Sequence, residues 1–560
     1  MSSSNVNRIA DISCRAVLDA TGHYGVEVDV TVGWGIVRSQ ARVSCAPDPD
    51  NDSDRTYYNS VISAIDTFDT SLKPRLVGAP LTESRAIDSV LDTSTQASPM
   101  PPQIAALTRS ISTAVWRGRA SGSNRPLYRL LAEEMKTPTI RLPTPIVSVL
   151  GGGAVADSEL GFAQILIFPL RTTSFKDALE SVVTVHQSIS KVLKSEFGVG
   201  GVTVADDGSF AAPLRDVEDA IRIVETALDN SGKIFEMGIG INCGASHLWD
   251  AAKEEYDTKW NWRKPEKESV DEEEPQQPTE EDVEHETEEP STDQPPLSSG
   301  RMHSARSESR STPGLENPPS ARPLSPKTSY TPLEWTDLLI SLIERHRILY
   351  LEHTHILEHD QELKRLFGYC STHNVLLAQS RPILEAFGEI ESVLPLSLST
   401  SLSEANTLTD LISLSADLQL TGHAVIVDCT MQKITETVSA DVAVGTGSGL
   451  IKLSLARGEN IEVVNQLLRV EEEMKGLAVY GFDLWRVVEK TQNELKAEFD
   501  ESERIRKEEI RRRKEEEERA RREEEERAAE EERRRVEAEE AAAAAAMAAE
   551  EQPEELPDEE

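Results

Sequence analysis

Residues 440–473, ADVAVGTGSGLIKLSLARGENIEVVNQLLRVEEE, read as a break, a buried strand and a helix in that order. The stretch begins at the end of a helix, and the glycines at 445, 447 and 449 break that helix before the strand. Residues 450–455 are short and apolar enough for a buried strand, with one cation, Lys452, inside it. Such a cation must reach the end of the strand or find a partner. The following helix places apolar side chains on one face: Ile461, Val464, Leu467 and Leu468. Strand, loop and helix predict the last unit of a β/α barrel.

Composition limits the class of protein. The 560 residues include 59 basic and 99 acidic side chains, which leaves a net charge of −40. This charge repels the phosphates of nucleic acid and of anionic lipid, so we expect neither nucleic acid nor membrane as a main partner. The first 15 residues lack the apolar core of a signal peptide, and the five cysteines are scattered. We therefore expect a soluble, cytoplasmic protein with an ordered body of about 400 residues.

The N-terminal part predicts a small α+β domain. Residues 15–19 are followed by the turn residues ATGHYG, and then Val26, Val28 and Val30 alternate with acidic residues as in a half-buried strand. Residues 104–132 read as helical.

Short apolar runs along the rest of the chain predict further strands. A strand covered on both faces reads as a continuous apolar run. Such runs occupy residues 165–168, 237–241, 348–351, 375–378, 393–396, 425–427 and 450–455. Helix-like stretches separate most of them, as in a β/α barrel.

Three motifs resemble enolase. The opening RAVLDATGHYGVEVD, residues 15–29, is similar to the family's Arg-x-Ile-Leu-Asp-Ser-Arg-Gly-Asn-Pro-Thr-Val-Glu-Val-Asp, and RPLYRLLAEEM, residues 125–135, is similar to the end of its N-terminal domain. Lys452, Arg457, Glu459 and residues 465–472 resemble its C-terminal strand lysine, Arg-x-Glu turn and last helix. The resemblance implies an α/β fold: an α+β domain at 8–138, then an enolase-type β/α barrel at 143–263 and 331–480. It also implies a homodimer.

Two segments lie outside this pattern. Residues 264–330 are rich in Pro, Ser and Glu, which predicts a disordered insertion, and whether its serines are phosphorylated stays open. Residues 484–551 combine dense Glu and Arg, which predicts a charged single helix, with a coiled coil as the alternative. Residues 552–560 form an acidic tail. We expect the insertion and the helix to bind protein partners.

The resemblance also implies a site at the ends of the barrel strands. Enolase removes a proton next to a carboxylate, using a lysine base and two Mg²⁺ ions held by three carboxylates. The three metal-ligand positions fall on Asn242, Glu352 and Gln379, so only Glu352 keeps its charge, and we expect Mg²⁺ binding to be lost or weak. The base position falls on Pro395, which offers no amine.

The remaining positions keep polar side chains. Lys452 stands where the family's second lysine contacts substrate, and Asp207 and Gln164 stand at the acid side of the site. Residues 429–431, Cys-Thr-Met, replace the His-Arg-Ser that grips phosphate. Lys452 and Asp207 are thus catalytic remnants, and Gln164 and Lys452 are candidate substrate contacts.

Each of the polar features that remain at these positions has two possible roles. Lys452 either pairs with Glu352 inside the barrel or binds an anion, and Asp207 either belongs to the site or only sets a turn. The glycines at 151–153 either make a tight turn or offer amides to an anion. A histidine-rich stretch is either solvent-facing or a metal site: Glu352, His353, His355, Glu358 and His359.

The pattern of losses favours an enolase-fold pseudoenzyme that acts as a structural or interaction protein. It resembles a divergent animal branch of the family associated with sperm and flagella, which implies a place in a cilium or flagellum. The alternatives are an active Mg²⁺-dependent phosphopyruvate hydratase of glycolysis, which would use Asp207, Lys452 and Glu352, and a barrel altered to bind another anion or a metal.

Overall fold

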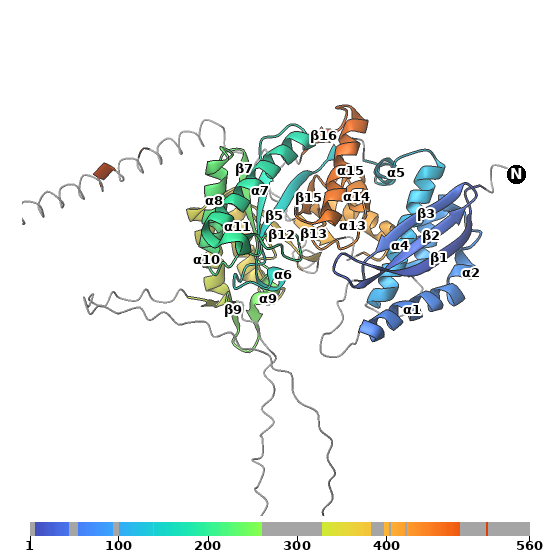
Figure 1. The fold of residues 1–560 in the computed structure, drawn as a ribbon, viewed down its shortest axis with the longest axis horizontal. Coiled ribbons are helices and arrows are strands. Elements are labelled where there is room, and N and C mark those ends of the chain that lie inside the picture. Colours follow the sequence, from blue (N-terminus) through green and yellow to red (C-terminus); the bar gives the residue numbers. More distant parts are fainter. Residues whose placement is uncertain are drawn as a thin grey trace, which may run out of the picture.

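The computed structural model describes residues 6–43, 54–92, 100–137, 139–259, 327–381, 383, 397–401, 405–420 and 423–481, together with 504, 511 and 512. These residues form a small N-terminal domain and a barrel that lie side by side (Figure 1). The fold predicted from the sequence, an enolase-type barrel preceded by a smaller α+β domain, is confirmed. The predicted insertion and charged C-terminal helix lie almost wholly outside the described residues.

An antiparallel sheet in the order β1-β2-β3 begins the chain, and α4 packs across it (Figure 1). The apolar residues of the sheet and of α4 share one buried cluster, which includes Ile12, Val28 and Ile111. The sequence predicted one helix over residues 104–132, but Pro126 separates two. The elements are β1 (Ile9–Leu18), β2 (Tyr24–Val32), β3 (Gly35–Ala41), α1 (Asp54–Ser71), α2 (Lys73–Leu76), η2 (Leu81–Glu83), α3 (Ser84–Asp92), α4 (Pro102–Gly122) and α5 (Leu127–Glu134).

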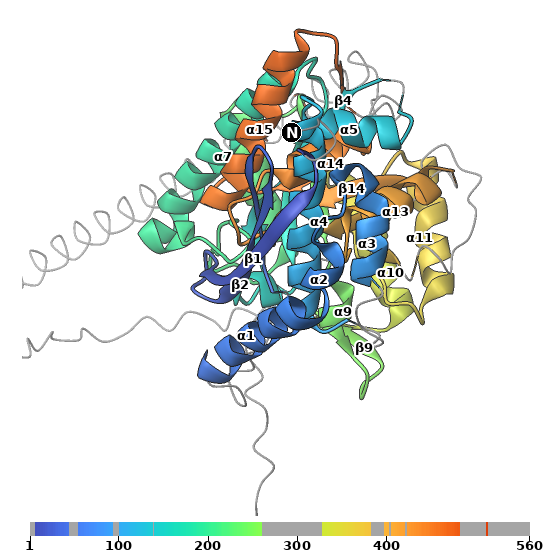
Figure 2. The same ribbon diagram turned by 90° about the vertical axis from the view of Figure 1, so that its right-hand side faces the viewer.

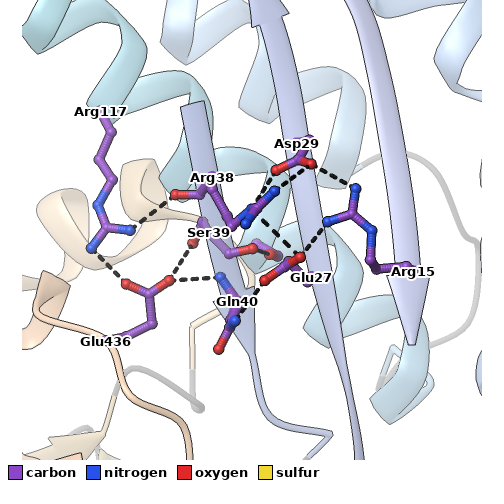
Figure 3. A network of polar contacts seen from close by, with 9 residues as sticks. Arg15, Glu27, Asp29, Arg38, Ser39, Gln40, Arg117 and Glu436 are labelled. Carbon is purple, nitrogen blue, oxygen red and sulfur yellow. Dashed lines mark hydrogen bonds and ion pairs between the residues drawn. The ribbon is translucent and has the colours of Figure 1, made fainter. Parts of the chain in front are cut away.

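The polar face of β2 is buried, which differs from the half-buried strand predicted. Glu27 and Asp29 are only 7% and 6% exposed. The guanidinium groups of Arg15 and Arg38, on the flanking strands, cover both carboxylates (Figure 3). Arg38 and then Arg15 hold the pKa of Asp29 at about 2, below its usual value. The alternation of apolar and acidic residues therefore predicted correctly which side chains share a face of β2. The acidic face, however, is covered by a salt-bridge network and not by water.

The barrel closes in the order β11-β12-β13-β14-β15-β5-β6-β7. Its strands are β5 (Thr144–Gly151), β6 (Gln164–Pro169), β7 (Met237–Asn242), β11 (Ile348–Glu352), β12 (Leu376–Gln379), β13 (Ser397–Ser401), β14 (Ala424–Asp428) and β15 (Leu450–Leu453). The predicted apolar runs coincide with these strands, except that residues 393–396 lie outside the described residues. One strand departs from a simple β/α barrel, since β6 runs antiparallel to both β5 and β7.

Helices surround the barrel (Figure 1), and the short strands form two small sheets outside it, β10-β9-β8 and β16-β4. The helices are α6 (Gly153–Ala156), α7 (Phe175–Phe197), η3 (Gly198–Val202), α8 (Val217–Asn230), α9 (Ala245–Leu248), α10 (Pro332–Arg345), α11 (Asp360–Thr372), α13 (Leu408–Leu420), α14 (Val438–Gly445) and α15 (Gly458–Met474). The short strands are β4 (Arg141–Leu142), β8 (Trp249–Asp250), β9 (Glu255–Asp257), β10 (Ser329–Tyr330) and β16 (Val479–Tyr480). None of the helices in the described ranges is long and apolar enough to cross a membrane.

The glycines of the opening stretch have specific roles. A Cβ on Gly445 would lie 2.5 Å from the Cβ of Leu131, so glycine allows α14 to pack closely on α5. Gly447 and Gly449 have φ angles of +67° and +74°, which L side chains rarely adopt. These backbone turns lead the chain from α14 directly into β15.

The N-terminal domain contacts the barrel through the loop that follows β14. Glu436 of this loop accepts hydrogen bonds from Gln40 N at 2.6 Å and Ser39 Oγ at 3.2 Å, and it forms an ion pair with Arg117 at 2.6 Å (Figure 3). Ala20 N also donates to the carbonyl of Lys433 at 2.7 Å. In Figure 2 the N-terminal domain lies in front of the barrel.

Candidate functional site

Polar side chains gather at one end of the barrel, which we call the mouth. Asn242, Glu352, Gln379 and Asp428 are the last residues of β7, β11, β12 and β14, which run parallel. Because β6 is antiparallel, its first residue, Gln164, lies at the same end and pairs with Asn242. The sequence placed most of these residues together correctly, because carboxyl ends of parallel strands meet at one edge.

Lys452 is the positive centre of the mouth. Its Nζ lies 2.8 Å from Glu352 Oε2 and 3.2 Å from Asp428 Oδ2. The side chains of Lys452 and Glu352 are 1% and 0% exposed. Burial alone would lower the pKa of Lys452, but Asp428 and Glu352 outweigh it and raise the pKa above its ordinary value. Of the two roles considered for Lys452, the pairing with Glu352 is confirmed.

A chain of amides and hydroxyls occupies the other side of the mouth. Asn242 Nδ2 donates to Gln164 Oε1 at 3.0 Å, and Gln164 Nε2 donates to Asp207 Oδ2 at 2.6 Å. Ser148 Oγ also donates to Asp207 Oδ2, at 2.7 Å. The second oxygen of Asp207 accepts from Ser209 N and Oγ at 2.9 and 2.5 Å. Asp207 therefore both sets the predicted turn and binds to the barrel, and it is fully buried.

Gln379 is held by a threonine that the sequence analysis missed. Its Nε2 donates to Thr354 Oγ1 at 2.5 Å, and its Oε1 is buried without a hydrogen-bond partner in the part of the chain that is described. This neutral oxygen is the one amide acceptor of the mouth that the structure leaves open among those residues.

The mouth does not fit the Mg²⁺ ions that the family resemblance implies. Magnesium prefers several carboxylate oxygens at short distance. Here an ammonium lies against Glu352, the amide oxygen of Asn242 accepts from Gly244 N at 3.1 Å, and Gln379 offers one neutral oxygen. A divalent cation would have to displace Lys452 from a site where its charge is already balanced.

The histidine stretch does not converge on a metal. His355 Nε2 contacts Thr336 Oγ1 at 3.0 Å, and burial lowers the pKa of His355 to about 3. His359 Nδ1 contacts the Tyr256 hydroxyl at 2.6 Å, whereas His353 Nδ1 lies 3.7 Å from Glu352. Over the described ranges, no three His, Cys, Asp or Glu side chains are grouped to hold a metal ion. The described residues therefore offer no grouped metal ligands in this stretch, and the solvent-facing alternative does not hold for Glu352 and His355, which are 0% and 2% exposed.

The glycine triplet makes a turn. The amides of Gly151, Gly152 and Gly153 donate to the carbonyls of Phe210, Ala163 and Leu160 at 3.0, 2.9 and 2.5 Å. A Cβ on Gly152 would lie 2.3 Å from the carbonyl oxygen of Phe162. The alternative in which these amides bind an anion is wrong, because backbone acceptors already use them.

The base position and the loop at 429–431 are two further parts of the expected site. Pro395, at the position of the base, lies outside the described residues. In the loop 429–431, Thr430 N and Oγ1 donate to Asp428 Oδ1 at 2.8 and 2.6 Å, so the loop begins with a local turn.

Asp428 is the functional residue that the sequence analysis missed. It belongs to none of the motifs compared, but it directly follows the predicted run 425–427 and is the last residue of β14. A search for charged residues directly after each apolar run would have found it.

Comparison with known proteins agrees with this architecture. Residues 139–284 and 388–486 match the family of the enolase C-terminal TIM barrel domain. The barrel is similar to that domain over these residues. Glu352 and Gln379 fall in the interval between the two matched parts, although their strands, β11 and β12, belong to the same closed barrel.

Two relatives give the extent of the similarity. The chain is 27% identical over 259 residues to the enolase of Mastigamoeba balamuthi, which covers 45% of this chain and 59% of the relative. It is 29% identical over 259 residues to enolase B of Dictyostelium discoideum, which covers 44% and 58% respectively. The chain thus spans less than two thirds of the length of these enolases.

Proposed function

We propose that this chain is an enolase-fold pseudoenzyme that acts as a structural or interaction protein. The observation that carries the proposal is the Lys452 ammonium, which lies within 2.8 Å of Glu352 and 3.2 Å of Asp428. A buried cation that is already neutralised has little free charge to stabilise a substrate.

The chemistry of the family argues in the same direction. A carbon acid next to a carboxylate loses its proton only if the doubly charged enolate is stabilised by cations and a base is in reach. Two of three metal-ligand positions carry amides, Asn242 and Gln379, and the base position carries Pro395. Gln164 cannot transfer a proton at neutral pH, and its amide donates to Asp207.

Turnover of 2-phosphoglycerate with millimolar Mg²⁺ tests the loss of activity. We expect no rate above background for the full chain when phosphoenolpyruvate formation is followed by absorbance. An active enolase, assayed at the same protein concentration, provides the control. A rate within about a hundredfold of that control would support the active hydratase and end the pseudoenzyme proposal.

The interaction role concerns the segments outside the described residues. We propose that residues 264–330 and 484–551 bind protein partners in a cilium or flagellum, and that the protein is a homodimer. Sedimentation with purified axonemes, with and without residues 484–560, tests the first part. Equal retention of both forms would contradict a role for the C-terminal segment, and sedimentation velocity gives the oligomeric state.

A further inference from the structure

Three acidic side chains lie where the N-terminal domain contacts the barrel. Asp88 and Asp92 are one turn apart on α3 of the N-terminal domain, and Asp410 lies in the first turn of α13 of the barrel. Helix α13 packs against α3 and α4, and Figure 2 shows α13 beside α3. We call Asp88, Asp92 and Asp410 the carboxylate cluster.

Asp88 and Ser112 fasten the start of α13 to the N-terminal domain. Asp88 is fully buried, and its Oδ2 accepts from Trp116 Nε1 at 2.9 Å and from Thr409 Oγ1 and N at 2.5 and 3.2 Å. Ser112 Oγ of α4 accepts from Leu408 N at 3.0 Å. The backbone amides of Leu408 and Thr409 are therefore bound directly by side chains of the N-terminal domain.

Asp410 lies in surroundings that favour a negative charge. Its backbone N donates to Thr407 Oγ1 at 3.1 Å, and Thr407 N donates to Asp410 Oδ2 at 3.2 Å. This reciprocal pair of hydrogen bonds caps the N-terminus of α13, where the helix dipole stabilises an anion. The environment of Asp410 thus favours its ionised form.

Asp92 lies in the opposite surroundings. It is the last residue of α3, where the helix dipole disfavours an anion, and Asp88 precedes it by four residues on the same helix face. Its Oδ1 is buried and has no hydrogen-bond partner in the described part of the chain. Burial, then the charges of Asp410 and Asp88, raise the pKa of Asp92 to about 7. When two carboxyl groups are placed so differently, the proton that they share resides on one of them, here Asp92.

The basic side chains of α3 and α4 are engaged elsewhere. Arg85 of α3 and Arg119 of α4 pair with Glu134 at 2.9 and 2.7 Å. Arg109 of α4 donates to the carbonyl of Ala405 at 3.0 Å. Within the described ranges, no ion pair involves any member of the carboxylate cluster.

The chain that adjoins the cluster supplies no base either. Residues 93–99, which follow Asp92, read TSTQASP, and residues 402–404, which precede the loop to α13, read LSE. These undescribed residues add one acid and no basic side chain. The described residues also contain no group of three His, Cys, Asp or Glu side chains that could hold a metal ion. A proton is thus the positive charge that the cluster can take up.

We propose that the carboxylate cluster makes the contact between the N-terminal domain and the barrel dependent on one proton. When Asp92 holds the proton, it donates a hydrogen bond to Asp410, and α3 stays against the start of α13. When the proton leaves, two carboxylates face each other and the contact opens more often.

The consequence reaches the mouth of the barrel. Helix α13 follows β13, which runs parallel to β12 and β14, so the last residue of β13, Ser401, lies at the mouth end. A proton on Asp92 therefore controls how firmly the chain that leaves this end is held by the N-terminal domain. The control needs no metal and no turnover, so it goes beyond the pseudoenzyme role.

The direction of the pH dependence follows from the two states of the contact. With the contact closed the pKa of Asp92 is about 7, and with the contact open it returns toward its ordinary value of 3.8. The proton's contribution to the closed contact is complete below about pH 3.8 and is lost as the pH rises through about 7. Between pH 6 and pH 8 the equilibrium for opening should therefore rise about tenfold.

Hydrogen–deuterium exchange of the full chain, followed by mass spectrometry at pH 6 and pH 8, tests the proposal. Labelling times are scaled to cancel the pH dependence of the intrinsic exchange rate. We expect exchange at the start of α13 to be about tenfold faster at pH 8, because the amides of Leu408 and Thr409 exchange when the contact opens. Asp92→Asn should reduce this ratio to within about twofold, since an amide donates to Asp410 without ionising.

Two further variants separate the proposed pair from other acidic groups. Asp410→Asn removes the charge that faces Asp92 but keeps an oxygen for Thr407 N, so the ratio should fall below about threefold. Asp66→Asn changes an exposed acid on α1 of the same domain and should leave the ratio at about tenfold. Melting temperatures of all variants establish that they are folded.

The proposal is overturned if the ratio for the unmodified chain is below about twofold. A tenfold ratio that persists in folded Asp92→Asn would assign the pH dependence to another group and would also overturn it.

Discussion

A single side chain, Lys452, pairs with two carboxylates of the barrel mouth, Glu352 and Asp428. The ammonium is 1% exposed, so its desolvation must be offset by Glu352 and Asp428. Two amides and a third carboxylate complete the mouth, since Asn242 bonds to Gln164 and Gln164 bonds to Asp207.

Replacing this lysine should therefore destabilise the fold. Lys452→Met leaves Glu352 buried without its ammonium, and we expect a loss of about 3–5 kcal/mol in the free energy of unfolding, measured by urea denaturation. The double variant Lys452→Met with Glu352→Gln should recover part of that loss, because no buried charge is then left at β11. A single-variant cost below about 1 kcal/mol, or a double variant less stable than the single one, would contradict this account.

The sequence allowed part of this site to be predicted. The pairing of Lys452 with Glu352 followed from the need of a buried cation for a partner. Asp428 and Thr354 were not found in the same way, because no motif comparison assigned a role to either residue. Their role depends on which strand ends adjoin in space, as β14 adjoins β15.

Elements buried on both faces were the most predictable. The runs at β7, β11 and β14 are apolar throughout, and each became a barrel strand. The antiparallel direction of β6 could not be predicted, since an apolar run has the same pattern whether its strand is parallel or antiparallel to its neighbours. The burial of the acidic face of β2 was also missed, because arginines on β1 and β3 reach it only after the sheet has formed.

Helix α14 carries a buried carboxylate whose removal should stabilise the protein. Asp441 is 5% exposed, and burial raises its pKa to about 6. Since the pKa of Asp441 in the folded state exceeds its ordinary value of 3.8, its protonated carboxyl contributes to stability fully below about pH 3.8, and this contribution is lost as the pH rises through about 6.

Asp441→Asn should therefore increase the free energy of unfolding at pH 7 by about 1–3 kcal/mol, and the increase should vanish toward pH 4. Chemical denaturation between pH 4 and 8 measures it, with the exposed Asp229→Asn on α8 as the matched control. A gain of equal size at pH 4 and pH 7 would exclude ionisation of Asp441 as the cause.

At the scale of the whole molecule, a small antiparallel stem flanks the acidic insertion. Tyr330 of β10 pairs with Tyr256 of β9, and Thr258 N donates to the carbonyl of Thr328 at 2.7 Å. The chain thus leaves and re-enters the described structure at neighbouring points, although the next described residues after Lys259 begin at Lys327.

Residues 261–326 should therefore be replaceable by a short Gly-Ser linker. We expect the melting temperature to stay within about 3 °C of the wild-type value or to rise slightly. A shorter loop between fixed ends loses less conformational entropy when the protein folds. Differential scanning calorimetry measures the change, with the wild-type chain as reference. A fall of more than about 8 °C would mean that the insertion contributes to the fold.

The same stem divides the barrel between two lengths of polypeptide. Strands β5, β6 and β7 precede it and β11 to β15 follow it, and the ring closes at two seams, β7 with β11 and β15 with β5. A protease that cuts once between the arms of the stem would leave two fragments interlocked along both seams. Such a nicked protein would migrate as a single particle under native conditions and as two bands only after denaturation.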